Sequence, residues 1–329
     1  MYSNTKYICL PSKKNPTYLL AVGSKVEKNN SFNLFRALSI KAKILKYIAI
    51  KFPIFNTVTK EKSPFINYLE SEMNKNIVSS VYFSSCRHMV VMQLQSDGII
   101  LGYLKYALTE NGNRKIKNEQ YALENLKCIG IPRLINNGSF NQYRYILTES
   151  INNNPNLKPI NHDSLNLLLK RLTINGAPSY LLREHPRIIN LKKSLEKHHG
   201  LRKYIHYFDK LVLSDNKLYK VTPEHGDFTP WNIIHDKKKH YLIDFEDFIF
   251  EGLEGMDLCH YFFMEQLYIK KNSSSKIIKN TLNSVGLKNK KILYIYLIKT
   301  LIMRLNYKFE TSDYLSALKI YIEKIQHES

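Results

Sequence analysis

The sequence predicts an α+β fold in which a small antiparallel sheet comes first and a mostly helical part follows. Three apolar segments between residues 78 and 108 are separated by short polar turns, one of them Asp97-Gly98, which is typical of an antiparallel meander. From residue 150 onward, most segments repeat their apolar residues at helical spacing. A chain of 329 residues is long enough for two domains or for one bilobal unit with a sizeable core.

The first 60 residues form a predicted N-terminal extension. Short strands are expected at 7–10 and 17–22. Residues 34–52 predict a helix with one apolar face, whose members are Leu34, Leu38, Leu45, Ile48 and Phe52. We expect this face to pack on the domain, as it does in most amphipathic helices. The alternative is a basic amphipathic helix lying on an anionic membrane surface, which would make the protein membrane-peripheral.

Residues 61–149 are expected to contain the sheet. Ser63-Pro64 supplies a cap and a first-turn proline for a helix that reaches about Asn74. The expected strands are 78–84, 89–95 and 99–108, followed by a helix at 117–127 and by two strands that include 131–134 and 142–147. Lys105 lies inside the third of these strands, where a lysine usually faces solvent.

Residues 150–329 are expected to be mainly helical. The predicted helices are 163–172, 186–198, 204–213, 258–269, 275–287, 291–307 and 312–326. A short apolar run, Tyr241-Leu242-Ile243, is expected to be a strand that leads into Asp244.

Composition and charge narrow the class of protein. A hydrophobic content of 44%, with 12 Gly and 11 Pro, indicates an ordered globular chain. The 49 Lys and Arg residues exceed the 28 Asp and Glu residues, so the formal net charge is +21. Such a charge attracts anionic partners, for example nucleic acid, an anionic membrane face or acidic glycans. Nucleotide bias in the genome is an equally good explanation, because the basic residues are spread through the chain.

The cysteines and the N-terminus bear on the compartment. The four cysteines lie far apart and form no C-x-x-C motif, so neither a disulfide scaffold nor a zinc site is expected. The first residues lack the pattern of a secretory signal peptide, and no stretch of about 18 uncharged apolar residues occurs. We therefore expect a cytoplasmic protein.

Residues 224–257 carry the clearest chemical pattern. Asp227 is followed five residues later by Asn232 and, after an apolar run, by Asp244. Phosphoryl transfer from a nucleotide requires a carboxylate that accepts a hydroxyl proton and oxygen ligands for Mg²⁺. These three residues supply both. The alternative is a β-hairpin with solvated carboxylates at its ends, and the His225-Gly226 pair before Asp227 argues against it.

With His225-Gly226-Asp227, then Asn232, then Ile243-Asp244-Phe245-Glu246, this segment resembles the aminoglycoside phosphotransferase and choline kinase group of small-molecule kinases. The resemblance extends over roughly residues 60–329. It implies a bilobal protein-kinase-like α+β fold, with a small antiparallel N-lobe at 61–149 and a mostly helical C-lobe at 150–329. Glycine at 226 and glutamate at 246 differ from the protein-kinase pattern and favour the small-molecule branch.

The resemblance assigns roles in the loop. Asp227 would be the general base or the group that orients the acceptor hydroxyl. Asn232 and Asp244 would bind the Mg²⁺ that bridges the phosphates of ATP or GTP. His225 and Asp257 would support the loop structurally.

The resemblance also implies a nucleotide site in the sheet. Lys105 would contact the phosphates and pair with a glutamate, for which Glu119 is the candidate and Glu124 the competitor. The turn after the first predicted meander strand contains no glycine. Ser84 and Ser85 could hold phosphate through their side chains, and a plain exposed turn is the alternative.

The expected activity is therefore transfer of a phosphate from ATP or GTP to a hydroxyl of a small molecule, such as a sugar, a glycan precursor or an amino alcohol. Residues 244–257 contain six carboxylates and no Lys or Arg, which suits a cationic acceptor, whereas the basic chain suits an acidic or lipid-linked one. A catalytically weak kinase-like module that binds a nucleotide or a partner is the second hypothesis. Nucleic acid is not an expected partner, because no recognisable binding motif occurs.

Overall fold

The computed structural model describes residues 4–35, 37, 40–52, 56–84, 87–126, 130–151, 160–173, 176–236, 239–286 and 290–328. The predicted site residue Ser85 and the helix position Leu38 lie outside these ranges. The chain forms two compact units. The N-terminal unit comprises residues 1–158 and 234–246, and the C-terminal unit comprises residues 159–233 and 247–329. The predicted α+β class is confirmed, since a large antiparallel sheet lies in the first unit and most helices lie in the second.

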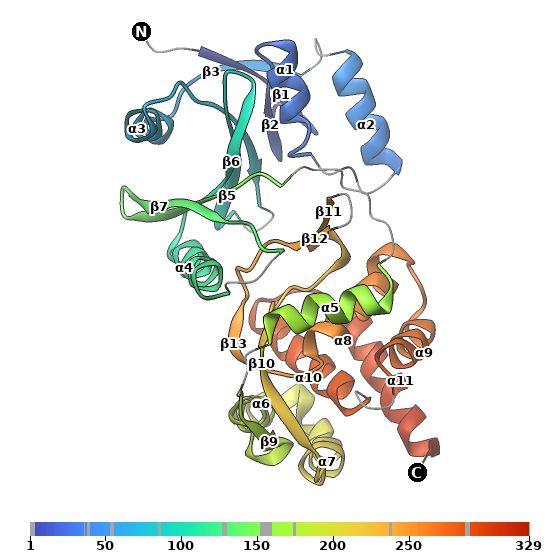
Figure 1. The fold of residues 1–329 in the computed structure, drawn as a ribbon. Helices are drawn as coiled ribbons and strands as arrows, with labels where there is room; N and C mark the ends of the chain where they lie inside the picture. Colours follow the sequence, from blue (N-terminus) through green and yellow to red (C-terminus); the bar gives the residue numbers. More distant parts are fainter. Residues whose placement is uncertain are drawn as a thin grey trace. The chain divides into compact units, whose positions relative to one another are not determined.

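The N-terminal unit is built on an eight-stranded antiparallel sheet with the order β3-β1-β2-β4-β5-β6-β8-β7 (Figure 1). Its strands are β1 Asn4–Leu10, β2 Tyr18–Ala21, β3 Thr57–Glu61, β4 Val78–Phe83, β5 Met89–Ser96, β6 Ile99–Ala107, β7 Leu134–Phe140 and β8 Tyr143–Thr148. The residues of the predicted extension thus contribute β1, β2 and most of β3 to this sheet. Asp97 and Gly98 have φ angles of 51° and 74°, as the tight turn between β5 and β6 requires.

Four helices pack on this sheet: α1 Lys25–Ser31, α2 Ile40–Lys51, α3 Pro64–Met73 and α4 Glu110–Asn125. On one face Leu69 of α3 packs with Leu94 and Leu104, and on the other face Phe32 and Ala49 pack with Ile8 and other residues. The ribbon of β11 Ile233–Asp236 and β12 Lys239–Leu242 is joined to the first part of the unit by a hydrogen bond from the amide of Leu242 to Gly130 O at 2.7 Å.

One helix prediction in this unit is confirmed, and a second has the wrong starting residue. The helix predicted from Ser63-Pro64 to about Asn74 is α3: the Ser63 hydroxyl accepts a bond from the Ile66 amide at 3.3 Å, and Asn74 ends the helix with a φ of 49°. The helix predicted at 117–127 begins earlier, at Glu110. The reason is a cap at Thr109, whose hydroxyl accepts a hydrogen bond from the Gly112 amide at 3.2 Å.

The apolar face predicted for residues 34–52 is wrong. The helix starts only at Ile40, so Leu34 is buried in the preceding segment and does not share the helical phase. The buried residue of α2 is Ala49, whereas Ile48 and Phe52 are 45% and 59% exposed. The packed face of α2 therefore differs from the predicted one.

The C-terminal unit combines a short sheet with a set of helices (Figure 1). The sheet has the order β13-β10-β9, with β9 Ser179–Leu181, β10 Leu218–Glu224 and β13 Ile249–Leu253. The helices are α5 His162–Leu172, α6 Pro186–Lys197, α7 Ile205–Phe208, α8 Met256–Met264, α9 Ser274–Val285, α10 Lys290–Asn306 and α11 Ser312–Glu328. Short 3₁₀ or π segments lie at Leu182–Glu184, His199–Tyr204, Asp209–Leu213, Pro230–Asn232 and Glu265–Ile269.

Each helix predicted after residue 160 is present. The centre of the unit is α10, in which Leu293, Tyr294 and Leu297 are fully buried. Among the described residues, no helix has both the length and the apolar character needed to cross a bilayer.

Candidate active site

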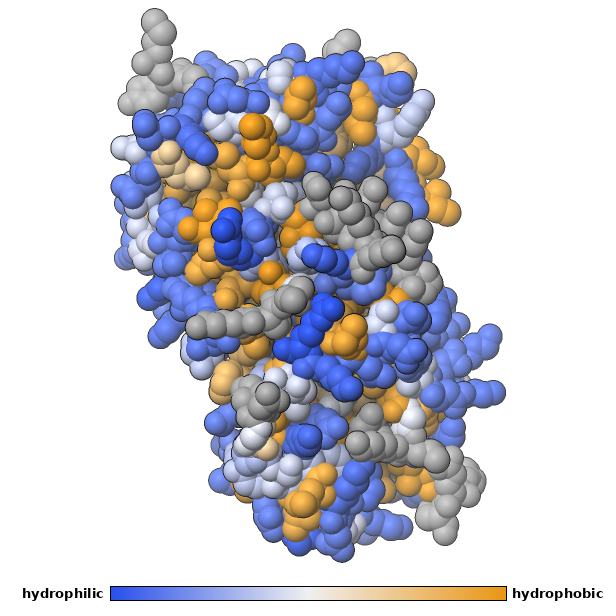
Figure 2. Space-filling model, viewed as in Figure 1, coloured by the Kyte–Doolittle hydropathy of each residue, from blue (hydrophilic) through white to orange (hydrophobic). Residues whose placement is uncertain are grey.

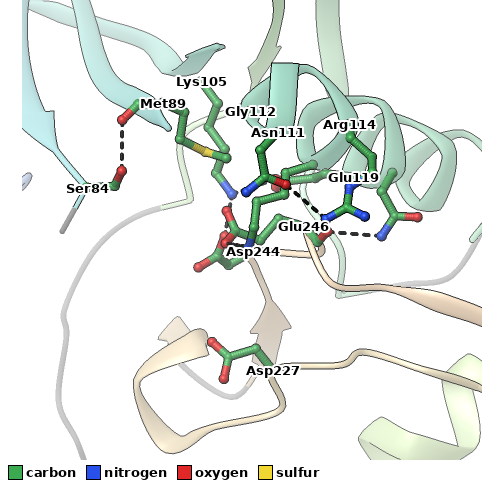
Figure 3. A network of polar contacts seen from close by, with 12 residues as sticks. Ser84, Met89, Lys105, Asn111, Gly112, Arg114, Glu119, Asp227, Asp244 and Glu246 are labelled. Carbon is green, nitrogen blue, oxygen red and sulfur yellow. Dashed lines mark hydrogen bonds and ion pairs between the residues drawn. The ribbon is translucent and has the colours of Figure 1, made fainter. Parts of the chain in front are cut away.

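Lys105 lies at the centre of a charged cluster in the N-terminal unit. It projects from β6, and its Nζ lies 2.5 Å from Glu119 Oε2 on α4 and also donates to Asp244 Oδ1. Figure 3 shows the Lys105 side chain pointing toward both carboxylates. Of the two candidate glutamates, Glu119 is 4% exposed and faces Lys105, whereas Glu124 is exposed and accepts a hydrogen bond from Gln120 at 2.8 Å.

The segment with Asp244 is attached to α4 by two more contacts. The Nζ of Lys115 lies 2.6 Å from Glu246 Oε1, and the Asn118 amide donates to the Glu246 carbonyl at 3.0 Å. Lys115, Asn118 and Glu119 occupy one face of α4, since they are spaced three and four residues apart. That spacing is visible in the sequence and could have identified this face. Asp244 itself has a φ of 72°, a left-handed conformation that these contacts hold in place.

Neighbouring charges and burial together shift the pKa values of Lys105 and Glu119. Burial acts to lower the pKa of Lys105, but the carboxylates of Asp244, Glu119 and Glu246 outweigh burial and raise that pKa above its usual value. Lys105 is therefore a permanent cation. Burial raises the pKa of Glu119, and the Lys105 ammonium acts in the opposite direction. A buried, fixed ammonium is the group that nucleotide phosphates require on the protein side.

Asp227 lies in a loop of the C-terminal unit whose backbone is fixed by Asp257. The amides of His225 and Gly226 donate to the Asp257 carboxylate at 2.7 and 3.2 Å. Burial raises the pKa of Asp257 to about 7, assisted by Glu224 and opposed by the two amide donors. Gly226 has a φ of 85°, and a Cβ there would lie 1.9 Å from the carbonyl oxygen of Asp247. Only glycine fits this position.

Two side chains hold the carboxylate of Asp227. The Asn232 amide nitrogen donates to Asp227 Oδ2 at 2.8 Å and to the Asp227 carbonyl at 3.0 Å. On the other oxygen, His260 Nε2 lies 2.9 Å from Asp227 Oδ1. Because an ionised carboxylate only accepts hydrogen bonds, Nε2 carries the hydrogen in this contact. Both oxygens of Asp227 are thereby oriented.

His260 lies outside the sequence motif and was not predicted. It belongs to α8 and follows Asp257 by three residues, which places both on the same side of the helix. Its Nδ1 lies 3.1 Å from the hydroxyl of Tyr296 on α10. Burial raises the pKa of Tyr296 well above its usual value, so this phenol stays protonated. The spacing D-x-x-H at the start of a helix is the signal that could have identified His260.

The predicted metal ligands fit Mg²⁺ in their chemistry. Since the nitrogen of the Asn232 amide is used on Asp227, its oxygen is the atom that can coordinate a cation. Asp244 offers a carboxylate that is one-third exposed. Among the described residues, no group of three His, Cys, Asp or Glu side chains is arranged to hold a metal.

The turn predicted to hold phosphate is described only in part. The Ser84 hydroxyl donates to the Met89 carbonyl at 3.0 Å, as Figure 3 shows. Arg87 donates from its guanidinium to Asn15 Oδ1 at 2.6 Å. The contacts of Ser84 and Arg87 are thus within the turn or with its neighbour Asn15, and a phosphate-binding role for Ser84 stays a prediction.

Comparison with solved structures finds many similar chains, three of which are described below. No protein-family model and no curated protein sequence matches this chain. A crystal structure described as a fructosamine-3-kinase from Haemophilus somnus 129PT is 13% identical, with a TM-score of 0.49, and the match covers 79% of this chain and 96% of that one. A macrolide 2′-phosphotransferase type I is 9% identical, with a TM-score of 0.49, and the match covers 77% of this chain and 94% of that one. An aminoglycoside-3′-phosphotransferase of type VIII is 12% identical, with a TM-score of 0.36, and the match covers 79% of this chain and 99% of that one.

By name, one of these structures is a kinase and the other two are phosphotransferases. Because the identities are at most 13% and the TM-scores are below 0.5, the function of this protein has to rest on its own side chains.

Proposed function

We propose that this protein is a magnesium-dependent phosphotransferase that moves the terminal phosphate of ATP or GTP to a hydroxyl group of a small molecule. The observation that supports this most strongly is the cluster of Lys105, Glu119 and Asp244. These residues come from β6, from α4 and from the segment after β12, and they meet in one ion-paired group in which Glu119 is buried and Asp244 is one-third exposed. In protein kinases a lysine that contacts the phosphates pairs with a helix glutamate, and a separate aspartate holds the metal ion.

In this mechanism, Asp227 acts on the acceptor. The acceptor hydroxyl donates its hydrogen bond to the oriented carboxylate, its oxygen forms a bond to the terminal phosphorus, and the bond from phosphorus to the bridging oxygen breaks. The hydroxyl proton passes to Asp227. Asn232 and His260 keep the carboxylate in one orientation throughout, so its position is set before the acceptor binds. Lys105 neutralises charge on the phosphates. Bound Mg²⁺, held by Asn232 and Asp244, would neutralise the remainder.

The acceptor class is narrowed by what the carboxylates of residues 244–257 contact. Asp244 and Glu246 are paired with lysines, and Asp257 accepts two backbone amides. These three serve structure or metal binding, so the acidic stretch does not by itself form a pocket for an amine. We therefore propose a neutral or acidic hydroxyl compound, such as a sugar or a glycan precursor.

A thermal-unfolding titration with ATP and GTP, with and without Mg²⁺, tests the nucleotide site. A nucleotide at about one hundred times its dissociation constant adds about 2.7 kcal/mol to the stability of the native state. We expect this shift in the wild type with Mg²⁺, and its loss in Asp244→Asn. Glu124→Gln, an exposed carboxylate on the same helix as Glu119, is the matched control and should keep the shift. A wild type that shifts with neither nucleotide would overturn the proposal.

Transfer itself is tested with Asp227→Ala. We expect this variant to lose transfer while its nucleotide-dependent shift is kept, because Asp227 acts on the acceptor. Equal loss of nucleotide binding and turnover would contradict the assigned role. The second candidate, a kinase-like module that binds a nucleotide without turnover, is favoured only by the glycine-free turn at Ser84. It predicts a shift in the wild type and no phosphate transfer to any acceptor or to water.

A further inference from the structure

The outward side of α2 exposes a row of large apolar side chains. The exposed fractions are 77% for Ile40, 55% for Ile44, 63% for Tyr47, 45% for Ile48 and 59% for Phe52. Ile44 follows Ile40 by four residues, and Tyr47 and Ile48 follow Ile44 by three and four, which places these four along one side of the helix; Phe52 directly follows its last residue. Figure 2 shows apolar side chains along the outer side of α2, at the upper right of the view.

The opposite side of α2 is firmly attached to its own unit. Ala49 is buried with Phe32 and Leu20, and Leu45 packs beside them. The Lys46 ammonium donates to the carbonyls of Phe32 and Phe35 at 2.7 and 3.0 Å. Burial lowers the pKa of Lys46, which is consistent with its inward position. The exposed row is therefore the outer face of a docked helix.

A helix with apolar residues on all sides is normally buried on all sides. α2 has apolar residues on its packed face and on its exposed face, so something is expected to cover the second. A contiguous exposed apolar row of this kind typically marks an interaction site.

The positive charge of α2 indicates what kind of partner covers the exposed row. Lys41, Lys43 and Lys51 are exposed among the apolar row, and α2 contains no acidic residue. From residue 28 to residue 60, the sequence has seven Lys or Arg residues and no Asp or Glu. A second copy of the chain would bring two such lysine-rich faces together, which like-charge repulsion opposes. The partner must be anionic and must accept apolar side chains.

We propose that α2 docks this protein on an anionic membrane surface. Its 12 residues extend over about 18 Å, too short to cross a bilayer but suited to lying in the plane of the interface. The isoleucines and Phe52 would enter the acyl boundary, Tyr47 would remain at the headgroup level, and the lysines would reach the lipid phosphates. This inference is independent of the proposed phosphotransferase activity.

Co-sedimentation of the full-length protein with vesicles tests this proposal. The vesicles are phosphatidylcholine alone, and phosphatidylcholine mixed with the anionic phosphatidylglycerol. We expect binding to the mixed vesicles only, and weaker binding at high salt. The double variant Ile44→Ser/Tyr47→Ser should lose at least about tenfold in partitioning, because two exposed side chains no longer enter the lipid. Lys41→Glu/Lys43→Glu should lose about fivefold per lysine or more.

Matched controls separate α2 from the charge of the whole chain. Lys193→Glu/Lys197→Glu changes the net charge as much as the α2 lysine variant does, on exposed positions of α6. Ile99→Ser removes another isoleucine, 68% exposed, from the same unit. Both controls should bind the mixed vesicles like the wild type. The altered residues are all exposed, so unchanged melting temperatures are expected.

Three results would overturn the proposal. The first is absence of binding to the mixed vesicles. The second is binding that the α6 lysine variant weakens as much as the α2 variants do, which would indicate adsorption by net charge. The third is a dimer in solution that Ile44→Ser/Tyr47→Ser dissociates, which would assign the apolar row to a second copy of this chain.

Discussion

Asp227 is oriented by Asn232 on one oxygen and by His260 on the other. The two side chains differ in what their removal should do. Asn232 is also a proposed metal ligand, so its loss would affect nucleotide binding as well. His260 contacts Asp227 and Tyr296, which makes it a positioning residue whose effect should be confined to turnover.

We predict that His260→Leu lowers kcat by about a hundredfold, with the KM for nucleotide unchanged, because the carboxylate loses its fixed orientation. His260→Gln, whose amide can still donate to Asp227, should retain most of the activity. His206→Leu, at an exposed histidine of α7, is the control and should behave like the wild type. The measurement is magnesium-dependent release of phosphate from ATP to water or to an acceptor. A parallel rise in KM, or no rescue by Gln, would indicate a general structural role.

At the scale of elements, the loop around Gly226 has the tightest steric requirement. The Gly226 φ of 85° and the carbonyl of Asp247 both exclude a side chain. We predict that Gly226→Ala lowers the free energy of unfolding by about 3 kcal/mol or more, since it combines a left-handed conformation with a backbone clash. Gly176→Ala is the matched control: its φ is 77° and nothing lies within 4 Å of the added Cβ.

Urea unfolding of the two glycine variants measures this difference. Gly176→Ala should cost about 1 kcal/mol, the conformational part alone. Equal costs in both variants would mean that the loop can move away from Asp247. Because His225 and Gly226 give their amides to Asp257, such a movement would also displace Asp227, and activity would fall even in a stable variant.

Elements were predictable where a local signal sets them. Ser63-Pro64 defines the start of α3, and Asp97-Gly98 defines the turn between β5 and β6, because a cap and a left-handed turn act within a few residues. The predicted start of α4 is residue 117, although the helix begins at Glu110. The Thr109 hydroxyl, which accepts from the Gly112 amide, is the local signal that sets this start.

At the scale of the whole molecule, the resemblance implied that Lys105 pairs with Glu119, and the two side chains meet in the N-terminal unit, whereas the contact of Lys105 with Asp244 was not predicted. What could not be predicted was the choice of helix faces. The contact between His260 and Asp227 depends on how α8 and α10 pack around the loop. The exposed row of α2 depends on which of the two apolar faces of this helix packs against the sheet. Periodicity gives the faces of a helix, but the packing partners select among them.

The pH dependence of the free energy of unfolding is set by buried carboxylates, and Glu224 is one whose ion-pair partner can be replaced by itself. Its side chain is 4% exposed, and its Oε2 lies 2.7 Å from the Lys299 ammonium. Burial alone would raise the pKa of Glu224, but Lys299, Arg187 and the amide of Leu253 together outweigh burial and lower that pKa. A lowered folded-state pKa contributes stability above the unfolded value, and this stability is lost as the pH falls through the folded pKa.

We predict that Lys299→Met lowers the free energy of unfolding at pH 7.5 by about 3 kcal/mol, the lower end for breaking a buried pair, because Lys299 is one-third exposed. In the variant, burial should raise the pKa of Glu224 instead, so the deficit should shrink as the pH falls and Glu224 becomes protonated. Glu224→Gln/Lys299→Met should recover most of the loss at pH 7.5, since the neutral amide can still accept from Leu253. Urea unfolding at pH 7.5 and pH 4.5 measures both effects. A deficit that is equal at the two pH values would show that Lys299 stabilises the protein through packing of its aliphatic stem, and not through its charge.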